Sequence, residues 1–439
     1  MKNATASTRC TAQQSVSPTR RQLFQTVAGG IATAALLDLL QSDLYAAPQT
    51  QPRLRLPSHP PRATSVIHLF MNGGPSQMDL FDPKPELTRL HGQEHFEAIA
   101  GEVEFPDAAG ALMRSPFEFA RHGQCGMWVS ELMPHFSQHV DDVALIQSMY
   151  TTNLTHEPAL YKFHSGSEFT GRPSLGAWIT YGLGSENRNL PGYVVLEDPL
   201  GLPVNGVDNW QCGYLPAEFQ GTRFRATGAP VLNIRPDFEE PESVTSLERS
   251  LIERLDRIHQ ESHAGRTQLE ARIQTYQLAA RMQMSATDAL DLSQETAATH
   301  EMYGIGKEPT DSYGRRCLIA RRLVERGVRF VQLFINSQIW DNHSNIGTAL
   351  RDACNRTDQP VGALLTDLKQ RGLLDQTLVV WGGEMGRLPI SQMTPDRNPA
   401  TSGRDHNKNA MVAWLAGGGI RGGAIHGRTD ELGFAAVEN

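Results

Sequence analysis

Carboxylates and imidazoles that could bind a metal are concentrated near the end of the chain. Asp341 and His343 stand in a WDNHSN motif, Glu384 in a GGEMGR motif, and Asp405 and His406 in a GRDHN motif. Oxygen and nitrogen donors of this kind suit a borderline divalent ion such as zinc. A single Asp-x-His or Asp-His pair more often belongs to a solvated loop or a helix cap. Three groups beside three consecutive apolar segments therefore indicate a metal site more strongly than any one group alone.

Three short apolar runs beside these groups are expected to be buried strands, and they span Phe330–Ile335, Thr377–Trp381 and Met411–Ala416. Each run is apolar on both faces, which is typical of a strand in a parallel sheet covered by helices on both sides. Open α/β sheets bind ligands at the carboxyl ends of their strands. The first two groups of candidate ligands follow strands and the third precedes one, and we expect all three at one edge of the sheet.

Two further strands are expected earlier in the chain. Ser65–Met71 ends in NGGPSQMD, where paired glycines allow a sharp turn or a close approach to a ligand, and Asp79 is a further candidate oxygen ligand. Val143–Met149 leads into TTNLTHEP, whose proline marks the start of a helix. Free N–H groups at a helix N-terminus bind anions, so Thr155 or His156 could face a phosphate or sulfate. Simple capping of the helix by Thr155 is the alternative.

The predicted parallel orientation has a geometric consequence. Strands that share one orientation bring their carboxyl ends to the same edge. We therefore expect His156 to lie within about 10 Å of Asp341, His343 and His406, which is the scale of a small-ligand site. The carboxylates and imidazoles would hold the metal, and the helix N-terminus would hold the anionic group that faces it.

Length and composition describe a globular protein. The 439 residues are 39% hydrophobic and carry a formal net charge of −8, which is enough for a large core. The net charge and a pI near 6.0 argue against a general nucleic-acid binder. The five cysteines form no CxxC motif, which argues against a zinc ribbon and leaves one or two disulfides open; they are Cys10, Cys125, Cys212, Cys317 and Cys354.

The first residues resemble an export signal. Arg20 and Arg21 precede a modest apolar run, Val27–Leu37, which is too short for a comfortable membrane span. Residues 1–47 are therefore expected to be a cleaved twin-arginine signal, with residues 48–63 as a Pro-rich linker. This predicts a periplasmic or extracellular protein with no membrane span in its mature chain. An uncleaved anchor and a cytosolic extension are the alternatives.

The middle of the chain differs from its two ends. Residues 173–300 are expected to form an insertion that covers the sheet or the site, with a strand-like run at Tyr193–Leu196 and helical spacing of leucines over Ser243–Thr299. Arg315–Arg326 is expected to be a helix whose arginines form a solvated face. Gly347–Arg371 is expected to be the crossover helix between two strands. Strands alternating with helices predict an α/β fold with a mostly parallel sheet flanked by helices on both faces.

Longer motifs resemble one bacterial family over nearly all of the chain after residue 64. They include MNGGPSQMDLFDPKPEL, PSLGAWITYGLGSEN, CLIARRLVERGVRFVQLF, RGLLDQTLVVWGGEMGR and GRDHNKNAMVAWLAGGGIRGG. They are similar to the domain of unknown function 1501 family of the alkaline phosphatase and sulfatase superfamily. The resemblance implies an alkaline-phosphatase-like domain over residues 64–439. It also implies a further helical segment after GRTDELG, so a truncated C-terminus is expected.

The superfamily resemblance implies roles for individual residues. Asp341 and His343 match two metal ligands that follow a strand, although they are spaced more closely here. Glu384 matches an acidic ligand at the end of the next strand. His406 matches a histidine ligand before the last strand, and Asp405 would be a ligand or its partner.

Three positions depart from the superfamily pattern. Met385 stands where a histidine usually follows the acidic ligand. Asn72 stands where the first strand usually ends in an aspartate, with Asp79 a few residues later. Thr155 and His156 occupy the place of the nucleophile. A histidine there puts covalent phosphoryl or sulfuryl transfer in doubt, although Thr155 could substitute as the nucleophile.

The sequence therefore supports two functions. The first is an exported hydrolase of phosphate or sulfate esters that uses a divalent metal, zinc or calcium, with Arg387 as a clamp on the anionic group. Its substrate would be a small anionic ester or a sulfated or phosphorylated polymer. The second is a non-catalytic exported binding or scaffold protein that retains the fold, which the departures at Met385 and His156 favour.

Overall fold

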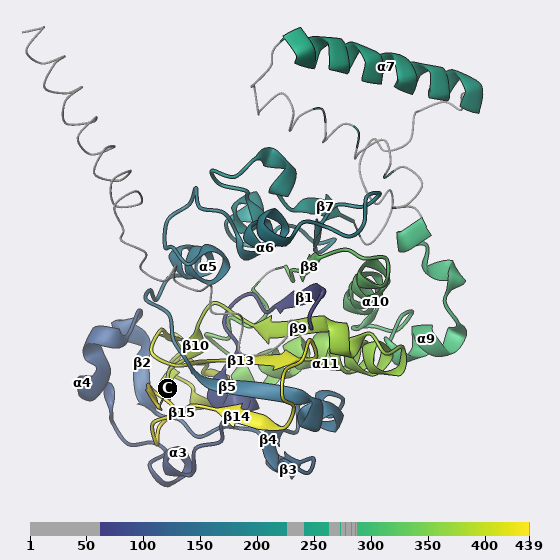
Figure 1. Ribbon diagram of the computed structural model, residues 1–439. Coiled ribbons are helices and arrows are strands. Elements are labelled where there is room, and N and C mark those ends of the chain that lie inside the picture. The colour runs from purple at the N-terminus through teal and green to yellow at the C-terminus, as the bar shows by residue number, and fades with distance from the viewer. Residues whose placement is uncertain are drawn as a thin grey trace, which may run out of the picture. The chain divides into compact units, whose positions relative to one another are not determined.

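A computed structural model describes most of the chain after the linker (Figure 1). The described residues are 62–225, 241–262, 288–336 and 338–438, with single helical positions at 273, 277, 282 and 286. Residues Arg62–Asn439 form one compact unit. The predicted twin-arginine signal and all but the last two residues of the predicted linker lie outside the described residues.

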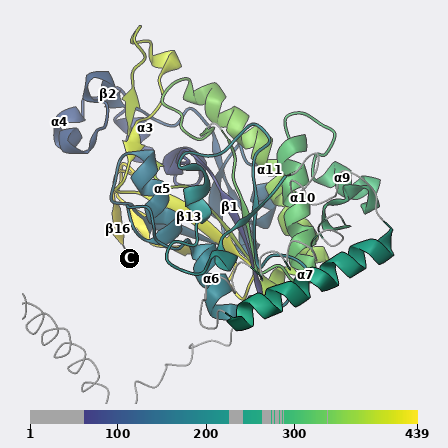
Figure 2. The same cartoon turned by 90° about the horizontal axis from the view of Figure 1, so that it is seen from above.

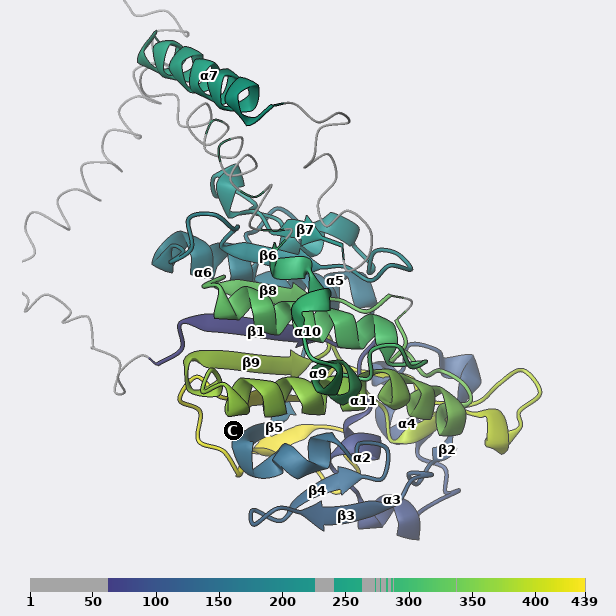
Figure 3. The same ribbon diagram turned by 90° about the vertical axis from the view of Figure 1, so that its right-hand side faces the viewer.

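The centre of this unit is an eight-stranded sheet with the order β14-β5-β13-β9-β1-β8-β6-β7 (Figure 3). β13 runs antiparallel to both of its neighbours, β9 and β5, and every other neighbouring pair is parallel. The strands are β1 (Ser65–Phe70), β5 (Val143–Met149), β6 (Tyr193–Leu196), β7 (Thr222–Phe224), β8 (Phe330–Leu333), β9 (Thr377–Gly382), β13 (Met411–Ala416) and β14 (Ala424–His426). The mostly parallel sheet predicted from the sequence is confirmed.

Side chains of the central strands alternate between two apolar layers. In β1, Ile67 and Leu69 pack into the larger core, which also contains side chains of α10 (Asp311–Glu325) and α11 (Ile346–Gln370). Val66 and Phe70 point to the other face, where they pack with residues of α5 (His156–Ser165) and α6 (Leu175–Leu183). The helices thus cover both faces of the sheet (Figure 2), which explains why its strands are apolar on both sides.

The arginines of α10 correct one expectation. They were predicted to form a solvated face, but Arg316, Arg321 and Arg322 are buried. Arg316 pairs with Asp198 at 2.8 Å, and Arg321 pairs with Asp367 at 2.8 Å. Buried guanidinium groups of this kind are stable only when carboxylates and carbonyls satisfy them, and those partners lie far away in sequence.

The remaining elements are short or lie at the periphery. The helices are α2 (Gln77–Leu80), α3 (Pro85–Arg89), α4 (Phe96–Ile99), α7 (Glu242–Ser262) and α9 (Ala297–Met302). The strands are β2 (Ala109–Leu112), β3 (Phe119–His122), β4 (Met127–Ser130), β10 (Gly386–Arg387), β11 (Ile390–Gln392), β12 (His406–Asn407), β15 (Arg428–Thr429) and β16 (Ala436–Glu438). Part of the region predicted to be an insertion belongs to the main sheet, because it supplies β6 and β7.

The described residues also bear on disulfides and on membrane-spanning helices. The cysteines at 125, 212, 317 and 354 are all free thiols, so the disulfides that the sequence left open do not form among them. Within the described ranges, no helix has both the length and the apolar character needed to cross a membrane.

Candidate metal centre

One edge of the sheet collects the candidate ligands because of the direction of its strands. β1, β8 and β9 are parallel, so the loops after them, which carry Gly73, Asp341 and Glu384, begin at the same edge. β5 is parallel to β9 through the intervening antiparallel β13, which brings the start of α5 with His156 to that edge. β13 runs the other way, so the segment before it also arrives there, with His406 paired to Arg387 between β12 and β10.

Three of these residues form a tight triangle of donor atoms. His343 Nε2 lies 2.8 Å from Asp341 Oδ1, and His406 Nε2 lies 3.1 Å from the same oxygen. The two Nε2 atoms are 3.0 Å apart. His156 lies beside this triangle, with its Nε2 atom 3.4 Å from the second oxygen of Asp341 and its ring centroid 4.4 Å from that of His406. The expectation that His156 lies near the other three residues is confirmed.

The second ring nitrogen of each histidine faces an oxygen atom. Nδ1 of His156 lies 2.7 Å from Glu384 Oε1. Nδ1 of His343 contacts Gln392 Oε1, and Nδ1 of His406 contacts Glu104 Oε2. An oxygen acceptor at Nδ1 places the proton on that atom, which leaves the Nε2 lone pair of a neutral ring free to bind a metal.

The donor atoms fit a small divalent metal. A tetrahedral zinc site with bonds of about 2.1 Å has ligand atoms about 3.4 Å apart, a little more than the sides of the triangle. Two unprotonated Nε2 atoms at 3.0 Å cannot hydrogen-bond to each other, so a shared cation is the simplest way to satisfy them. The ligand atoms of His156, Asp341, His343 and His406 all lie within 4.8 Å of one another. Glu384 Oε2 is buried without a hydrogen-bond partner among the described residues, which also points to a bound group.

Arg387 and a glycine turn fix the position of Asp341. Arg387 is buried and donates to Asp341 Oδ1 at 2.6 Å and to Gly74 O at 2.9 Å, and it also contacts the carbonyl oxygen of Gly73. Gly73 has a φ of +108°, and a Cβ atom there would lie 2.5 Å from the backbone nitrogen of Asp341. Only glycine fits this close approach, which explains the NGG motif after β1.

The charges around the triangle shift the pKa values of its members. Burial opposes ionisation of Asp341, but Arg387 and the neighbouring histidines outweigh it and hold the pKa of this carboxyl well below its ordinary value. Burial also opposes protonation of His156, but the carboxylates of Asp341 and Glu384 outweigh it and raise the pKa of His156 to about 9. Without a metal, the imidazolium of His156 thus bridges two carboxylates.

Two predicted ligands, Glu384 and Asp405, lie beside the triangle and do not belong to it. Glu384 Oε1 accepts from the backbone nitrogen of Gly73 at 2.8 Å and contacts His156. Asp405 accepts from the backbone nitrogens of Phe105 at 2.9 Å and His406 at 2.7 Å. Asp405 also brings a ligand atom within 4.8 Å of atoms of Glu104 and His406, so it borders the centre from the other side.

Three further predicted residues have other partners. Asp79 forms a fully buried ion pair with Arg404, with Oδ2 2.7 Å from Nε. The hydroxyl of Thr155 donates to Asn153 Oδ1 at 2.8 Å, and no side chain caps the helix that Thr155 precedes. The donors of Arg387 are directed at backbone carbonyls and Asp341, as described above, and the clamp role predicted for it stays a prediction.

Two residues at the centre were not found by sequence reasoning. Glu104 comes from the segment before β2, and Gln392 comes from β11. Neither stands in a motif with a chemical pattern, because an oxygen acceptor behind an imidazole can come from many residue types. The contact of Glu104 with His406 joins positions 302 residues apart, so no local spacing could indicate it.

Comparisons with known proteins relate the chain to one family. A search of the curated proteins found no match. The chain is similar to three solved structures: the PsFucS1 sulfatase from Pseudoalteromonas sp. (13% identity, TM-score 0.35), an alkaline phosphatase from the Antarctic bacterium TAB5 (12%, 0.34) and the lipoteichoic acid synthase LtaP from Listeria monocytogenes (9%, 0.34). These matches cover 85%, 81% and 83% of this chain and 66%, 92% and 68% of the respective structures. The family model described as "Protein of unknown function (DUF1501)" matches residues 63–439, and the chain is therefore a member of the DUF1501 family.

Proposed function

We propose that the chain is a metal-dependent hydrolase of phosphate or sulfate esters. The observation that carries the proposal is the triangle of Asp341, His343 and His406, whose donor atoms lie 2.8 to 3.1 Å apart. Three protein ligands with a further coordination position free are typical of catalytic zinc sites. Two imidazoles and one carboxylate favour zinc over calcium, which prefers oxygen ligands only.

The neighbouring residues would carry the proton chemistry. A metal held by the triangle would polarise an ester oxygen and lower the pKa of a bound water. His156 would hold or move a proton at Nε2, which faces the triangle, while Glu384 orients the ring through Nδ1. Arg387 would keep Asp341 in place. This proposal moves Glu384 from the ligand role predicted from the sequence to a positioning role.

Two features support an anionic substrate at this edge. α5 is ten residues long and begins at His156, and no side chain caps its N-terminus. The N–H groups of His156 and Glu157, at the start of α5, would favour a phosphate or sulfate group bound beside the donor triangle. The side chains of His343 and Asp341 are 26% and 20% exposed, so the triangle can be reached from solvent.

A binding or scaffold protein is the second candidate function. Two observations favour it. Met385 is buried where the superfamily resemblance implies a histidine. The hydroxyl of Thr155, at the expected place of the nucleophile, is bonded to Asn153 in an exposed position. A hydrolase with this arrangement would have to use water as its nucleophile, and a scaffold protein would need only the metal.

Metal analysis and a substrate screen distinguish the two functions. We expect purified protein to contain about one equivalent of zinc and to hydrolyse some members of a broad panel of phosphate and sulfate esters. His343→Ala should remove both metal and activity. His156→Ala should keep the metal but lower kcat by about 10² to 10⁴, as expected for loss of acid–base catalysis. The exposed His426→Ala variant is a matched control and should change neither.

Two outcomes would contradict the hydrolase. Less than about a tenth of an equivalent of any divalent metal would remove the basis of the proposal. Full metal content without hydrolysis of any ester, with zinc, manganese or calcium added, would favour the scaffold protein. Activity that survives in His343→Ala would place the chemistry elsewhere.

Export is a separate proposal. We propose that Arg20 and Arg21 direct the chain across the membrane by the twin-arginine route, which carries proteins already folded. A metal centre assembled before export would then reach the periplasm or the cell exterior intact. The support is the pattern of paired arginines before a short apolar run.

A further inference from the structure

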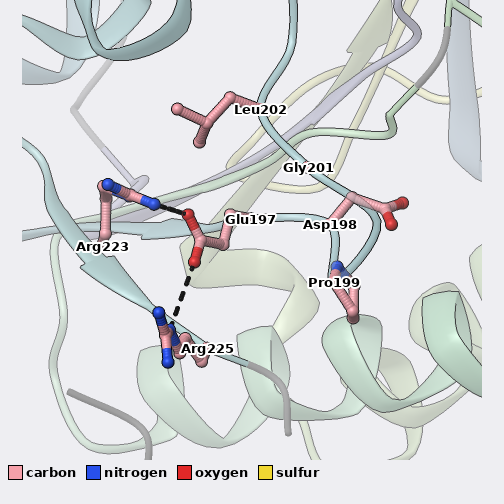
Figure 4. A pocket seen from close by; sticks show the side chains of 7 residues that line it. All are labelled: Glu197, Asp198, Pro199, Gly201, Leu202, Arg223 and Arg225. Carbon is pink, nitrogen blue, oxygen red and sulfur yellow. Dashed lines mark hydrogen bonds and ion pairs between the residues drawn. The ribbon is translucent and has the colours of Figure 1, made fainter. Parts of the chain in front are cut away.

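A second polar pocket lies at the carboxyl ends of β6 and β7 (Figure 4). Its volume is about 330 Å³, and its lining includes Glu197, Arg223 and Arg225. The two arginines point toward the Glu197 carboxylate from different sides (Figure 4). Arg223 contacts one carboxylate oxygen, and Arg225 Nε lies 3.7 Å from the other.

The pocket carries an excess of positive charge. Asp198, which also lines it, is paired with the buried Arg316 at 2.8 Å, so these two charges cancel. Glu197 then balances only one of Arg223 and Arg225, which leaves a net charge of +1. Both arginine side chains are more than 40% exposed, whereas that of Glu197 is 11% exposed. The carboxylate therefore holds the arginines in place while their remaining N–H groups face the pocket.

The pocket shares its edge of the sheet with the metal centre. β8, which leads to Asp341, is followed across the sheet by β6 and then β7, and all three strands are parallel. The loops that hold the centre follow β8, β1 and β9, which lie two, three and four strands from β7. At about 4.8 Å per strand, these loops begin about 10 to 20 Å from the end of β7 across the sheet. A neighbouring cavity of about 460 Å³ shares Asp198 and Pro199 with this pocket and is also lined by Asn336 and Ile339, in the loop before Asp341. The two cavities thus extend from the arginines to the loop after β8, and the residues that line them include none of the donor triangle.

We infer that Arg223 and Arg225 bind a second anionic group of the substrate. The inference rests on the proposed ester hydrolysis and specifies its substrate class. One sulfate or phosphate ester would lie at the metal centre, and another anionic group of the same molecule would lie between the arginines. The substrate is therefore a polyanion that carries several such esters, and a small monoester would use only the metal centre. The chain carries an overall charge of −8, which repels a polyanion, so Arg223 and Arg225 would supply the local attraction.

Calorimetric titration with two probes tests the inference. The metal-loaded protein would be titrated with a polysulfated hexasaccharide and, separately, with a monosulfated one. We expect Arg225→Gln to weaken binding of the polysulfated probe by about tenfold, the usual effect of losing one charge-assisted contact. Arg223→Gln should do the same, and binding of the monosulfated probe should change little in either variant. Arg421→Gln is the matched control, because Arg421 is exposed and lines neither cavity.

The variants also separate this inference from the proposed function. Arg225 has the looser ion pair, so Arg225→Gln should fold even if Arg223→Gln does not, and a thermal melt checks both. Unchanged affinity of Arg225→Gln for the polysulfated probe would overturn the anion site, whether or not esters are hydrolysed. Weaker binding in Arg225→Gln, together with no hydrolysis of any ester by the parent protein, would support the anion site and overturn the hydrolase. A rise in KM for polysulfated esters at unchanged metal content would support both.

Discussion

Replacing Glu104 should weaken metal binding although Glu104 belongs to the surroundings of the donor triangle and not to the triangle itself. Its Oε2 atom accepts from Nδ1 of the buried His406. Burial opposes ionisation of Glu104, but this hydrogen bond together with the charges of His406, His156 and His343 outweighs it and holds the pKa of Glu104 below its ordinary value, so the acceptor is a carboxylate. A carboxylate behind a metal-binding imidazole fixes the ring and makes Nε2 a better donor.

The magnitude follows from the contacts that Glu104 makes. Loss of such a partner lowers metal affinity by about 10- to 100-fold, or about 1.4 to 2.7 kcal/mol. This agrees with about 1.5 to 3 kcal/mol for a hydrogen bond to a charged group. Glu104→Ala should show the full effect. Glu104→Gln should show a smaller one, because its amide oxygen can still accept from His406 but carries no charge.

A competitive zinc titration against a chelating dye measures this effect directly. Asp107→Asn serves as the control, since Asp107 is exposed in the same segment of the chain. Gln392→Ala tests the equivalent position behind His343. If Glu104→Ala binds zinc as tightly as the parent protein while remaining folded, the acceptor behind His406 does not tune the metal site. The contact between Glu104 and Nδ1 of His406 would then say nothing about metal binding at Nε2.

Three further predictions concern stability and export. Arg404→Met should lower the free energy of unfolding in urea by about 3 to 5 kcal/mol, because it leaves Asp79 charged and unpaired in the interior. Adding Asp79→Asn should recover part of this loss, and equal stability of the single and double variants would contradict the prediction. His68 is buried, and burial lowers its pKa to about 4, whereas the unfolded chain protonates near about 6.5. The unfolded state therefore binds more protons between these two pKa values, and about 3 kcal/mol of stability should be lost as the pH falls from 6.5 to 4. His68→Leu should flatten the plot of stability against pH over this range. An unchanged plot would refute the role of His68. Lysine at Arg20 and Arg21 should keep the full-length chain in the cytoplasm in a fractionation experiment, and normal export of that variant would exclude the twin-arginine route.

The strands of the sheet were largely predictable because burial on both faces leaves a clear pattern. The predicted runs Val143–Met149, Tyr193–Leu196 and Met411–Ala416 are β5, β6 and β13 without a change of bounds. β7 was not found, because its three residues, TRF, are too few to show a period. The direction of β13 could not be predicted either, since an apolar run reads the same in a parallel and an antiparallel strand.

The site was only partly predictable, for a related reason. Asp341, His343 and His406 stand in motifs whose residue types suit a metal, and the structure brings their donor atoms together. Sequence reasoning placed Glu384 with them and placed His156 opposite an anion. In the structure the side chain of Glu384 turns toward His156, whose Nε2 atom faces Asp341. Residue type restricts what a side chain can bind, but its partner depends on rotamers and neighbouring loops that no spacing encodes.

The single reversed strand is what completes the donor triangle. β13 is six residues long, so its two ends are about 20 Å apart at about 3.3 Å per residue. In a parallel β13, the segment before it would begin at the far edge of the sheet, and His406 would be out of reach of Asp341. Because β13 runs antiparallel to β9, the GRDHN motif arrives beside β10, where His406 pairs with Arg387, and Arg387 donates to Asp341. Because β13 is antiparallel, His406, which precedes this strand, lies beside the residues that follow β8.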